Sequence, residues 1–205
     1  MNIDLDSLDY VDLPEYLQQT EEIMCWLKSK SHEELKKLWG CNEKIVEQNF
    51  ERLAHMDLQK QLTPAVLSYE GLAYQYMAPA VFEYGQSEYV QEHLRILSVF
   101  YGVLKPMDGV IINLASKEYS RCVEKYLTDR DTYITVTFCE KSGNKLVTKG
   151  TYAKMARGEM VRFMAEKQIE DPVEMKNFDR LGYVYREDLS TDREYVFERR
   201  DTETQ

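Results

Sequence analysis

The first third of the chain repeats apolar residues at the three- and four-residue spacing of amphipathic helices. Pro14 suits the first turn of one helix, Ser31 and Glu34 form a capping box for a second that Gly40 ends, and Asn42 caps a third. The apolar positions are Leu17, Ile23, Met24 and Leu27, then Leu35, Leu38 and Trp39, then Ile45, Val46, Phe50 and Leu53. We expect these helices to pack as a flank of a sheet.

Short apolar runs in the middle of the chain predict strands at residues 65–69, 94–98 and 110–115. The third run is apolar almost throughout, which is typical of a central strand covered on both faces. Ser116 then suits the N-cap of a helix through residues 119–126, so this segment predicts a βα unit.

The last third alternates β-branched and aromatic residues over 132–138, turns at 142–144 and returns over 145–148, which predicts a hairpin. A helix over 151–167, a helical turn after Pro172 and strands at 183–186 and 194–199 follow. The predicted fold is therefore mixed α/β (α+β), with one domain over residues 1–205. Its mixed sheet is flanked by helices, and its C-terminal region reads hairpin, helix, strand.

Length and composition narrow the class of protein. A chain of 205 residues with 43% hydrophobic and 30% charged residues can bury its own core. Its apolar runs are far shorter than the roughly 20 residues that cross a bilayer, so we expect a cytoplasmic protein. The four cysteines lie far apart, which argues against disulfides and against a zinc site.

Known catalytic motifs are missing from the sequence. It has no phosphate-binding loop, no dinucleotide fingerprint, no nucleophile elbow and no His-Glu-x-x-His. Glu51 with His55, or Glu88 and Glu92 with His93, could share a metal, but solvated helix faces explain both groups more simply. We therefore expect no metal and no cofactor, and catalysis is not indicated.

Charge is distributed unevenly along the chain. The net charge is −10, yet residues 141–162 hold six bases and one acid. The six are Lys141, Lys145, Lys149, Lys154, Arg157 and Arg162. This basic island in an acidic protein is the sharpest anomaly of the sequence.

On the helix after Thr151, a rotation of 100° per residue shows which residues of the basic island share a side. One side, predicted to face the core, carries Tyr152, Met155, Ala156, Met160 and Phe163. The opposite side carries Lys154, Arg157 and Arg162, with Gly158, Val161 and Ala165 between them. We expect this strip of small residues to let a ligand backbone lie close to the helix.

Two strand-to-helix junctions suit an anion. Lys149 and Thr151 stand at the start of the basic helix, and Ser116 and Lys117 stand at the end of the predicted central strand. If both junctions face one cleft, they form a phosphate site. The alternative is that these cations only solvate two helices. Tyrosines clustered over residues 69–101 either pack in the core or stack on bases.

Several segments together resemble one family. They read LTPAVLSYEG at 62–71, LRILS at 94–98, YGVLKPMD at 101–108, NLASKEY at 113–119 and TYAKMARGEMVRF at 151–163. The chain is similar in these segments to the YaaA peroxide stress family of bacterial cytosolic proteins. Members usually carry a short strand reading like Ile-Ser-Pro-Ala-Lys ahead of the residues that match Met1. They also carry several dozen residues between the equivalents of Asp108 and Val110, so part of the family's polar cleft has no counterpart in this sequence.

The resemblance implies protection against hydrogen peroxide, lowered free iron, and DNA binding through an element like a helix-hairpin-helix. No such hairpin is evident in the sequence. The first hypothesis is a monomeric DNA-binding stress protein in which Lys117, Lys149, Lys154, Arg157 and Arg162, with Ser116 and Thr151, contact phosphates and read DNA shape. The rival is an enzyme or binding protein for a small phosphorylated or nucleotide-like ligand in the same cleft, with Glu70, Asp108 and Glu118 as acid or base groups. An iron-handling protein ranks last, because the chain has few histidines.

Overall fold

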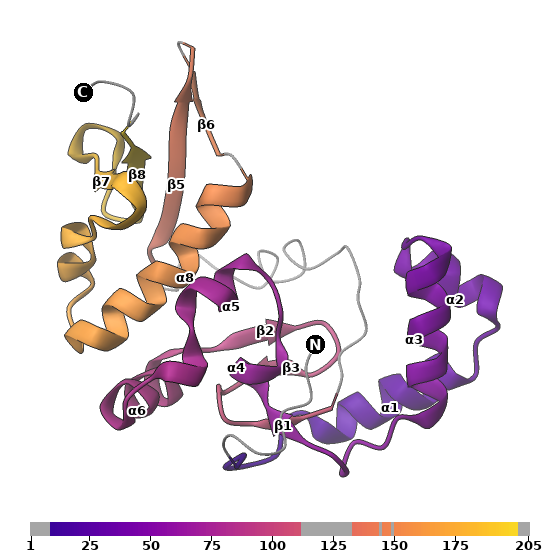
Figure 1. The fold of residues 1–205 in the computed structure, drawn as a ribbon. Coiled ribbons are helices and arrows are strands. Elements are labelled where there is room, and N and C mark those ends of the chain that lie inside the picture. Colours follow the sequence, from indigo (N-terminus) through magenta and orange to yellow (C-terminus); the bar gives the residue numbers. More distant parts are fainter. Residues whose placement is uncertain (1–8, 112–132, 144, 149, 201–205) are drawn as a thin grey trace. The chain divides into compact units, whose positions relative to one another are not determined.

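The computed structural model describes residues 9–111, 133–143, 145–148 and 150–200. The chain separates into two compact units. Unit 1 comprises Met1–Glu70 and Gln91–Leu127, and unit 2 comprises Gly71–Val90 and Thr128–Gln205. Each unit has helices and strands of its own (Figure 1), which confirms the mixed α/β class.

Unit 1 begins with the three predicted helices, α1 (Leu17–Lys28), α2 (His32–Trp39) and α3 (Glu43–His55). The capping box is present, because the Ser31 hydroxyl accepts the Glu34 N–H and the Glu34 carboxylate accepts the Ser31 N–H at 2.9 Å. The left-handed Gly40 ends α2, and the Asn42 side chain accepts the Ile45 N–H at 3.0 Å. All three helix predictions are confirmed. Their buried positions include Leu27, Leu35, Trp39, Val46 and Leu53.

The strands of unit 1 are short. Antiparallel pairs join β1 (Thr63–Pro64) with β4 (Gly109–Val110), and β2 (Ile96–Ser98) with β3 (Gly102–Leu104). The strand predicted at 94–98 is confirmed at its carboxyl end. Of the strand predicted at 110–115, only the first residues are described, and the helix predicted over 119–126 lies outside the described residues.

The strand predicted at 65–69 is wrong, since Ala65–Ser68 forms the short helix α4. Pro64 precedes this turn, and the N–H groups of Ala65 and Val66 bond to the carbonyls of Asp108 and Pro106 at 2.9 Å. Ala65, Val66 and Ser68 are all buried. A short run that is apolar all round carries no period, so the sequence alone could not separate a strand from a helical turn.

Unit 2 contains a four-stranded sheet in the order β6-β5-β8-β7. Its strands are β5 (Thr135–Ser142), β6 (Lys145–Val147), β7 (Tyr183–Tyr185) and β8 (Glu194–Arg199). β5 and β8 are parallel and the other pairs are antiparallel, so the sheet is mixed. The predicted hairpin and both C-terminal strands are confirmed, but the first strand of the hairpin, predicted at 132–138, extends to Ser142.

The helices of unit 2 are α5 (Leu72–Met77), the beginning of α6 (Tyr84–His93) and α8 (Gly150–Lys167). Short 3₁₀ turns cover Pro79–Val81, Pro172–Asn177, Arg180–Gly182 and Glu187–Leu189. The helix predicted at 151–167 and the turn after Pro172 are therefore confirmed.

An aromatic cluster forms the core of unit 2 between α8 and the sheet. Phe138, Phe163, Phe178, Tyr183 and Phe197 are buried there, and most of their rings meet edge to face at 5.1–5.8 Å between centroids. Such pairs add to the free energy of burial. This core fixes α8, and with it the candidate site, against the sheet.

None of the helices in the described part of the chain combines the length and the apolar character that a membrane span requires.

Candidate phosphate-binding surface

Helix α8 is packed on two sides, which corrects the geometry predicted for it. Ala156, Met160 and Phe163 are buried on the sheet side, as predicted. Tyr152 is instead 38% exposed, and the Arg199 guanidinium lies over its ring at 3.5 Å from the centroid. Ala153, which was not among the predicted core residues, is buried in its place.

The strip of small residues is a helix-packing surface and does not receive a ligand. Gly158 is buried, and a Cβ added there would overlap the carbonyl oxygen of Ala73 and lie 2.8 Å from the Met77 nitrogen of α5. Ala165 is fully buried as well. The expectation of a ligand backbone beside this strip is therefore wrong, because the backbone that approaches Gly158 belongs to α5.

The first two turns of α8 remain open. Thr151, Lys154 and Arg157 are exposed and follow one another at three-residue steps, so they form a slanting row, called here the α8 row. Neither cation of the row takes part in an ion pair with a carboxylate in the described segments. The structure thus brings together three of the predicted phosphate ligands.

Arg162 does not belong to the α8 row. Its Nε donates to the Glu166 carboxylate at 2.8 Å, Glu166 also binds Arg180, and Arg180 binds Glu159 at 2.9 Å. The hydrogen bond from Arg180 is the main reason that the pKa of Glu166 lies below its ordinary value. Arg162 is therefore a neutralised member of this four-residue network, called here the Arg180 network.

Cations of the hairpin lie in the same unit. Lys141 is 3.5 Å from the buried Glu198 carboxylate, which Arg186 also binds, whereas Lys145 is exposed on β6. Glu140, buried in the adjacent strand, pairs with Arg199 at 3.6 Å. Burial, reinforced by the Glu140 charge, raises the pKa of Tyr183 to about 12. These buried carboxylates were not predicted, although each directly follows a buried apolar residue in its strand, Cys139 before Glu140 and Phe197 before Glu198.

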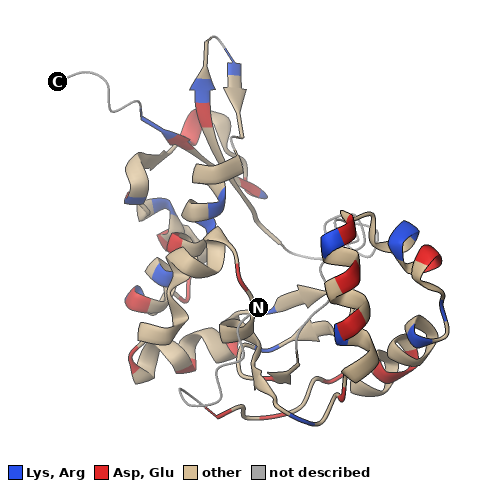
Figure 2. Cartoon of the chain, turned by 45° about the vertical axis from the view of Figure 1, so that its right-hand side comes forward, with Lys and Arg blue, Asp and Glu red and all other residues tan. Residues whose placement is uncertain are grey.

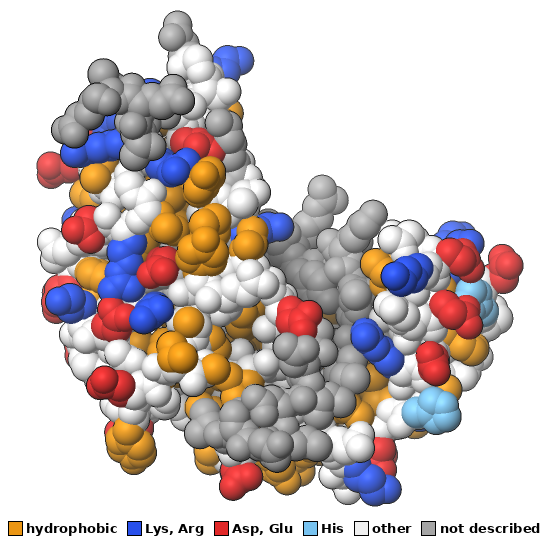
Figure 3. Space-filling model, viewed as in Figure 1, with side chains coloured by type: hydrophobic (Ala, Val, Ile, Leu, Met, Phe, Trp, Pro, Cys, Tyr) orange, Lys and Arg blue, Asp and Glu red, His pale blue; other side chains and the backbone are white. Residues whose placement is uncertain are grey.

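Cations and carboxylates are interspersed over most of the fold (Figures 2 and 3). The predicted ligands Ser116, Lys117 and Lys149 lie outside the described residues, so a cleft shared by the two junctions stays a prediction. The described site is the α8 row with Lys145 in the same unit.

The candidate acid and base groups of the rival hypothesis have no common site in the described residues. Asp108 is buried, and its carboxylate accepts the Lys105 N–H at 2.8 Å within a tight turn. Burial raises the pKa of Asp108. Glu70 is exposed and Glu118 lies outside the described residues. Asp108 thus has a structural role in the turn.

The tyrosine cluster divides between packing and exposure. Tyr89 and Tyr101 are buried, whereas Tyr84 is 79% exposed. Stacking of tyrosines on bases stays a prediction.

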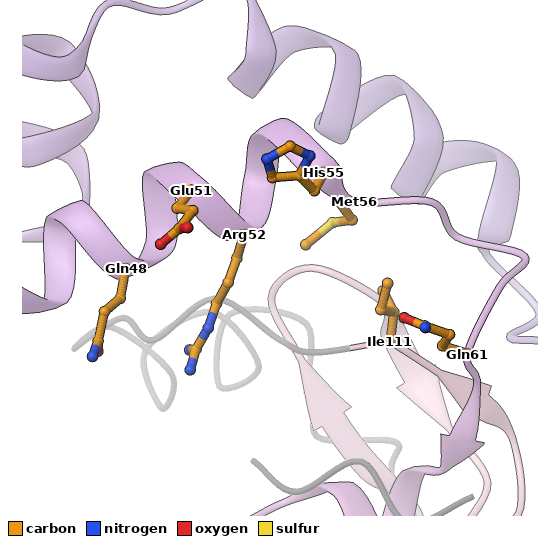
Figure 4. Close-up of a pocket in the computed structure, with 7 residues that line it drawn as sticks. All are labelled: Gln48, Glu51, Arg52, His55, Met56, Gln61 and Ile111. Atoms are coloured by element: carbon orange, nitrogen blue, oxygen red, sulfur yellow. The ribbon is translucent and has the colours of Figure 1, made fainter.

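The two groups considered as metal ligands, and set aside, lie in α3 and α6. Glu51 and His55 both line a cavity beside α3 (Figure 4). Over the described residues, no three His, Cys, Asp or Glu side chains are grouped as a metal site would need. The pair therefore contributes to a polar cavity.

Comparison with known proteins identifies the family. The family model for peroxide stress protein YaaA matches residues 2–111 and 108–189. A UPF0246 protein of Agathobacter rectalis is 59% identical, with 98% of this chain and 95% of the relative covered. A UPF0246 protein of Lachnoclostridium phytofermentans is 45% identical, with 94% of this chain and 90% of the relative covered. A UPF0246 protein of Limosilactobacillus reuteri is 43% identical, with 97% of this chain and 95% of the relative covered.

These matches also bear on the segment that family members carry between the equivalents of Asp108 and Val110. The alignment with the Agathobacter protein runs over 237 positions, at least 32 more than this chain has residues. The family model breaks into two matches that meet at 108–111. The family segment without a counterpart in this chain was expected at this point. With these matches covering most of its length, the chain belongs to the YaaA peroxide stress protein family.

Proposed function

We propose that this protein acts in the cytoplasm during peroxide stress by binding DNA phosphates through unit 2. One observation carries the proposal: in a chain of net charge −10, Lys154 and Arg157 are exposed one turn apart, and neither pairs with a carboxylate of the described residues. A cation without a partner can neutralise a phosphate and release its counterion at no cost in protein ion pairs. Lys145 adds a third exposed cation in the same unit.

Thr151 extends the same surface. It lies in the first turn of α8, where helix N–H groups lack intrahelical partners and the helix dipole favours an anion. Its hydroxyl can donate to a phosphate oxygen beside Lys154. Such contacts position a protein on the DNA backbone without reading sequence.

The connection to iron follows from the same chemistry. Bound lysine and arginine side chains displace condensed cations from the phosphates they neutralise. Ferrous ions held on the DNA backbone are among the cations displaced, so radicals formed from peroxide would arise farther from the DNA. The proposal needs no metal site in the protein.

Salt titration of duplex DNA binding tests the proposal. Logarithmic affinity should fall with logarithmic salt concentration by about 0.9 per phosphate contacted. The double variant Lys154→Gln/Arg157→Gln should reduce this slope by about two contacts. Arg162→Gln is the matched control and should leave the slope nearly unchanged, since Glu166 already neutralises that arginine. An unaltered slope in the double variant would overturn the proposal.

A further inference from the structure

A cavity of about 440 Å³ lies in unit 1 beside the C-terminal half of α3 (Figure 4). Gln48, Glu51, Arg52 and His55 occupy one face of α3, because their spacings of three, four and seven residues return to the same side of a helix. The volume is in the range of about 300–1,000 Å³ that small-molecule sites occupy.

The second wall of the cavity comes from the paired strands. Thr63 lies opposite Val110 in the β1–β4 ladder, so Gln61 and Ile111 emerge just beyond its end and both line the cavity. Met56, buried at the end of α3, completes the apolar part (Figure 4). Segments about 50 residues apart in sequence thus supply two apolar and five polar side chains among the described residues.

The five polar side chains are available to a ligand. Gln48, Glu51, Arg52, His55 and Gln61 make no hydrogen bond or ion pair with another described residue. Two carboxylates on the same helix do have partners, since Glu47 lies 3.3 Å from His32 and Glu43 pairs with Lys36. Gln61 also has φ +54°, a left-handed conformation that is uncommon for glutamine.

We propose that this cavity binds a nucleotide, meaning a heteroaromatic base with an attached phosphate. The Gln48 and Gln61 carboxamides each offer a donor and an acceptor, which is the pattern that base edges require. Met56 and Ile111 supply apolar surface for the base face, and the Arg52 guanidinium suits a phosphate. Glu51 accepts a hydrogen bond from a sugar hydroxyl or an exocyclic amine, and His55 adds a further polar group.

Other ligand classes fit this lining less well. An apolar ligand would desolvate several polar side chains without replacing their hydrogen bonds. A free phosphate would use Arg52 alone and leave the carboxamides and the apolar wall without a role. Among the described lining residues, Glu51 and His55 are one carboxylate and one imidazole, fewer than the three ligands that a metal site needs.

The nucleotide site does not depend on DNA binding by the α8 row, since the two lie in different units. Calorimetric titration of the intact chain with each common ribonucleoside 5′-monophosphate tests it, with the matching nucleosides and inorganic phosphate for comparison. At least one monophosphate should bind more tightly than its nucleoside and than phosphate. Arg52→Gln should weaken it by about tenfold or more, the usual effect of losing a charge-assisted hydrogen bond.

Matched variants test whether the monophosphate binds in this cavity. Gln48→Ala should weaken binding of the monophosphate, whereas Lys37→Gln, which removes an exposed cation of α2, should leave it unchanged. Lys154→Gln/Arg157→Gln should also leave it unchanged, which separates this site from the proposed DNA surface. Thermal unfolding checks that each variant is folded.

A competition experiment distinguishes a free nucleotide from a base within a nucleic acid. A short single-stranded oligonucleotide is tested for displacement of the bound monophosphate from the parent chain and from Arg52→Gln. Displacement from the parent chain and not from Arg52→Gln would identify an unstacked base of a nucleic acid as a ligand. Lack of displacement would identify a free nucleotide. The proposal is overturned if no monophosphate binds at millimolar concentration, or if binding is equal in the parent chain, Arg52→Gln and Gln48→Ala.

Discussion

The two halves of α8 carry similar residues and have different chemical roles. In the first half, Lys154 and Arg157 are exposed and have no carboxylate partner among the described residues. In the second part, which we take from Gly158 onward, the backbone of α5 lies against Gly158, and Arg162 joins Glu166, Arg180 and Glu159. Whether a cation can bind phosphate thus depends on what lies beside it, and a count of charges along the helix does not show this.

The largest effect should come from the packed half. Gly158→Ala would place a Cβ against the Ala73 carbonyl and 2.8 Å from the Met77 nitrogen, and neither backbone atom can rotate away. We expect the free energy of unfolding to fall by about 3 kcal/mol. Denaturant unfolding followed by circular dichroism would measure the change.

Gly150→Ala is the control for this comparison. It lies at the open end of the same helix, and nothing within 4 Å would meet the new methyl group. Its effect should stay within about 1 kcal/mol of the parent chain. Similar destabilisation by the two variants would contradict the difference drawn between the halves.

A smaller effect should follow from the Arg180 network. Arg180→Gln would leave two partly buried carboxylates, Glu159 and Glu166, without their shared partner and would remove the cation from the Phe163 ring. Since these side chains keep 17–27% of their exposure, we expect a loss of about 1–2 kcal/mol, between the values for surface and buried pairs.

Arg157→Gln removes the same charge from the open half and should change the unfolding free energy by no more than about 0.5 kcal/mol. Equal losses in Arg157→Gln and Arg180→Gln would mean that Arg157 has a structural partner, which would weaken its role as a phosphate ligand.

Local sequence patterns sufficed for most of the fold. The capping box at Ser31 and Glu34 and the β5–β6 hairpin each involve neighbours in sequence, and both elements are present, although β5 extends to Ser142, four residues beyond the predicted strand. Residues 65–69 failed because their conformation is set by hydrogen bonds to Pro106 and Asp108, some forty residues away.

The candidate site was less predictable, because its chemistry depends on distant partners. The role of Gly158 needs α5, which lies about eighty residues earlier in the chain, although a glycine inside a helix usually has a packing reason. The pairing of Arg162 could have been inferred, since Glu166 is four residues farther along the helix. The pairing of Arg180 with Glu166 could not have been inferred from the sequence. The same holds for the position of Gln61 and Ile111 together beside α3.

The smallest effect is the pH dependence of the Arg180 network. Glu166 has a pKa below the ordinary value of 4.5, chiefly through its hydrogen bond from Arg180. A carboxyl group whose folded pKa is lowered stabilises the fold above its unfolded pKa, and this contribution is lost as the pH falls through the folded pKa. The difference in unfolding free energy between the parent chain and Glu166→Gln should therefore be constant near neutral pH and shrink below about pH 4.5.

Repeating the comparison in the Arg180→Gln background isolates the cause. Without the arginine, the pKa of Glu166 loses its main source of depression, so the pH-dependent part of the difference should largely disappear. A difference that persists unchanged in that background would assign the effect to Arg162 and would show that Arg162 holds Glu166 more strongly than Arg180 does. In either case Arg162 is paired with a carboxylate, which is why we propose the open half of α8, and not the packed half, as the DNA-binding surface.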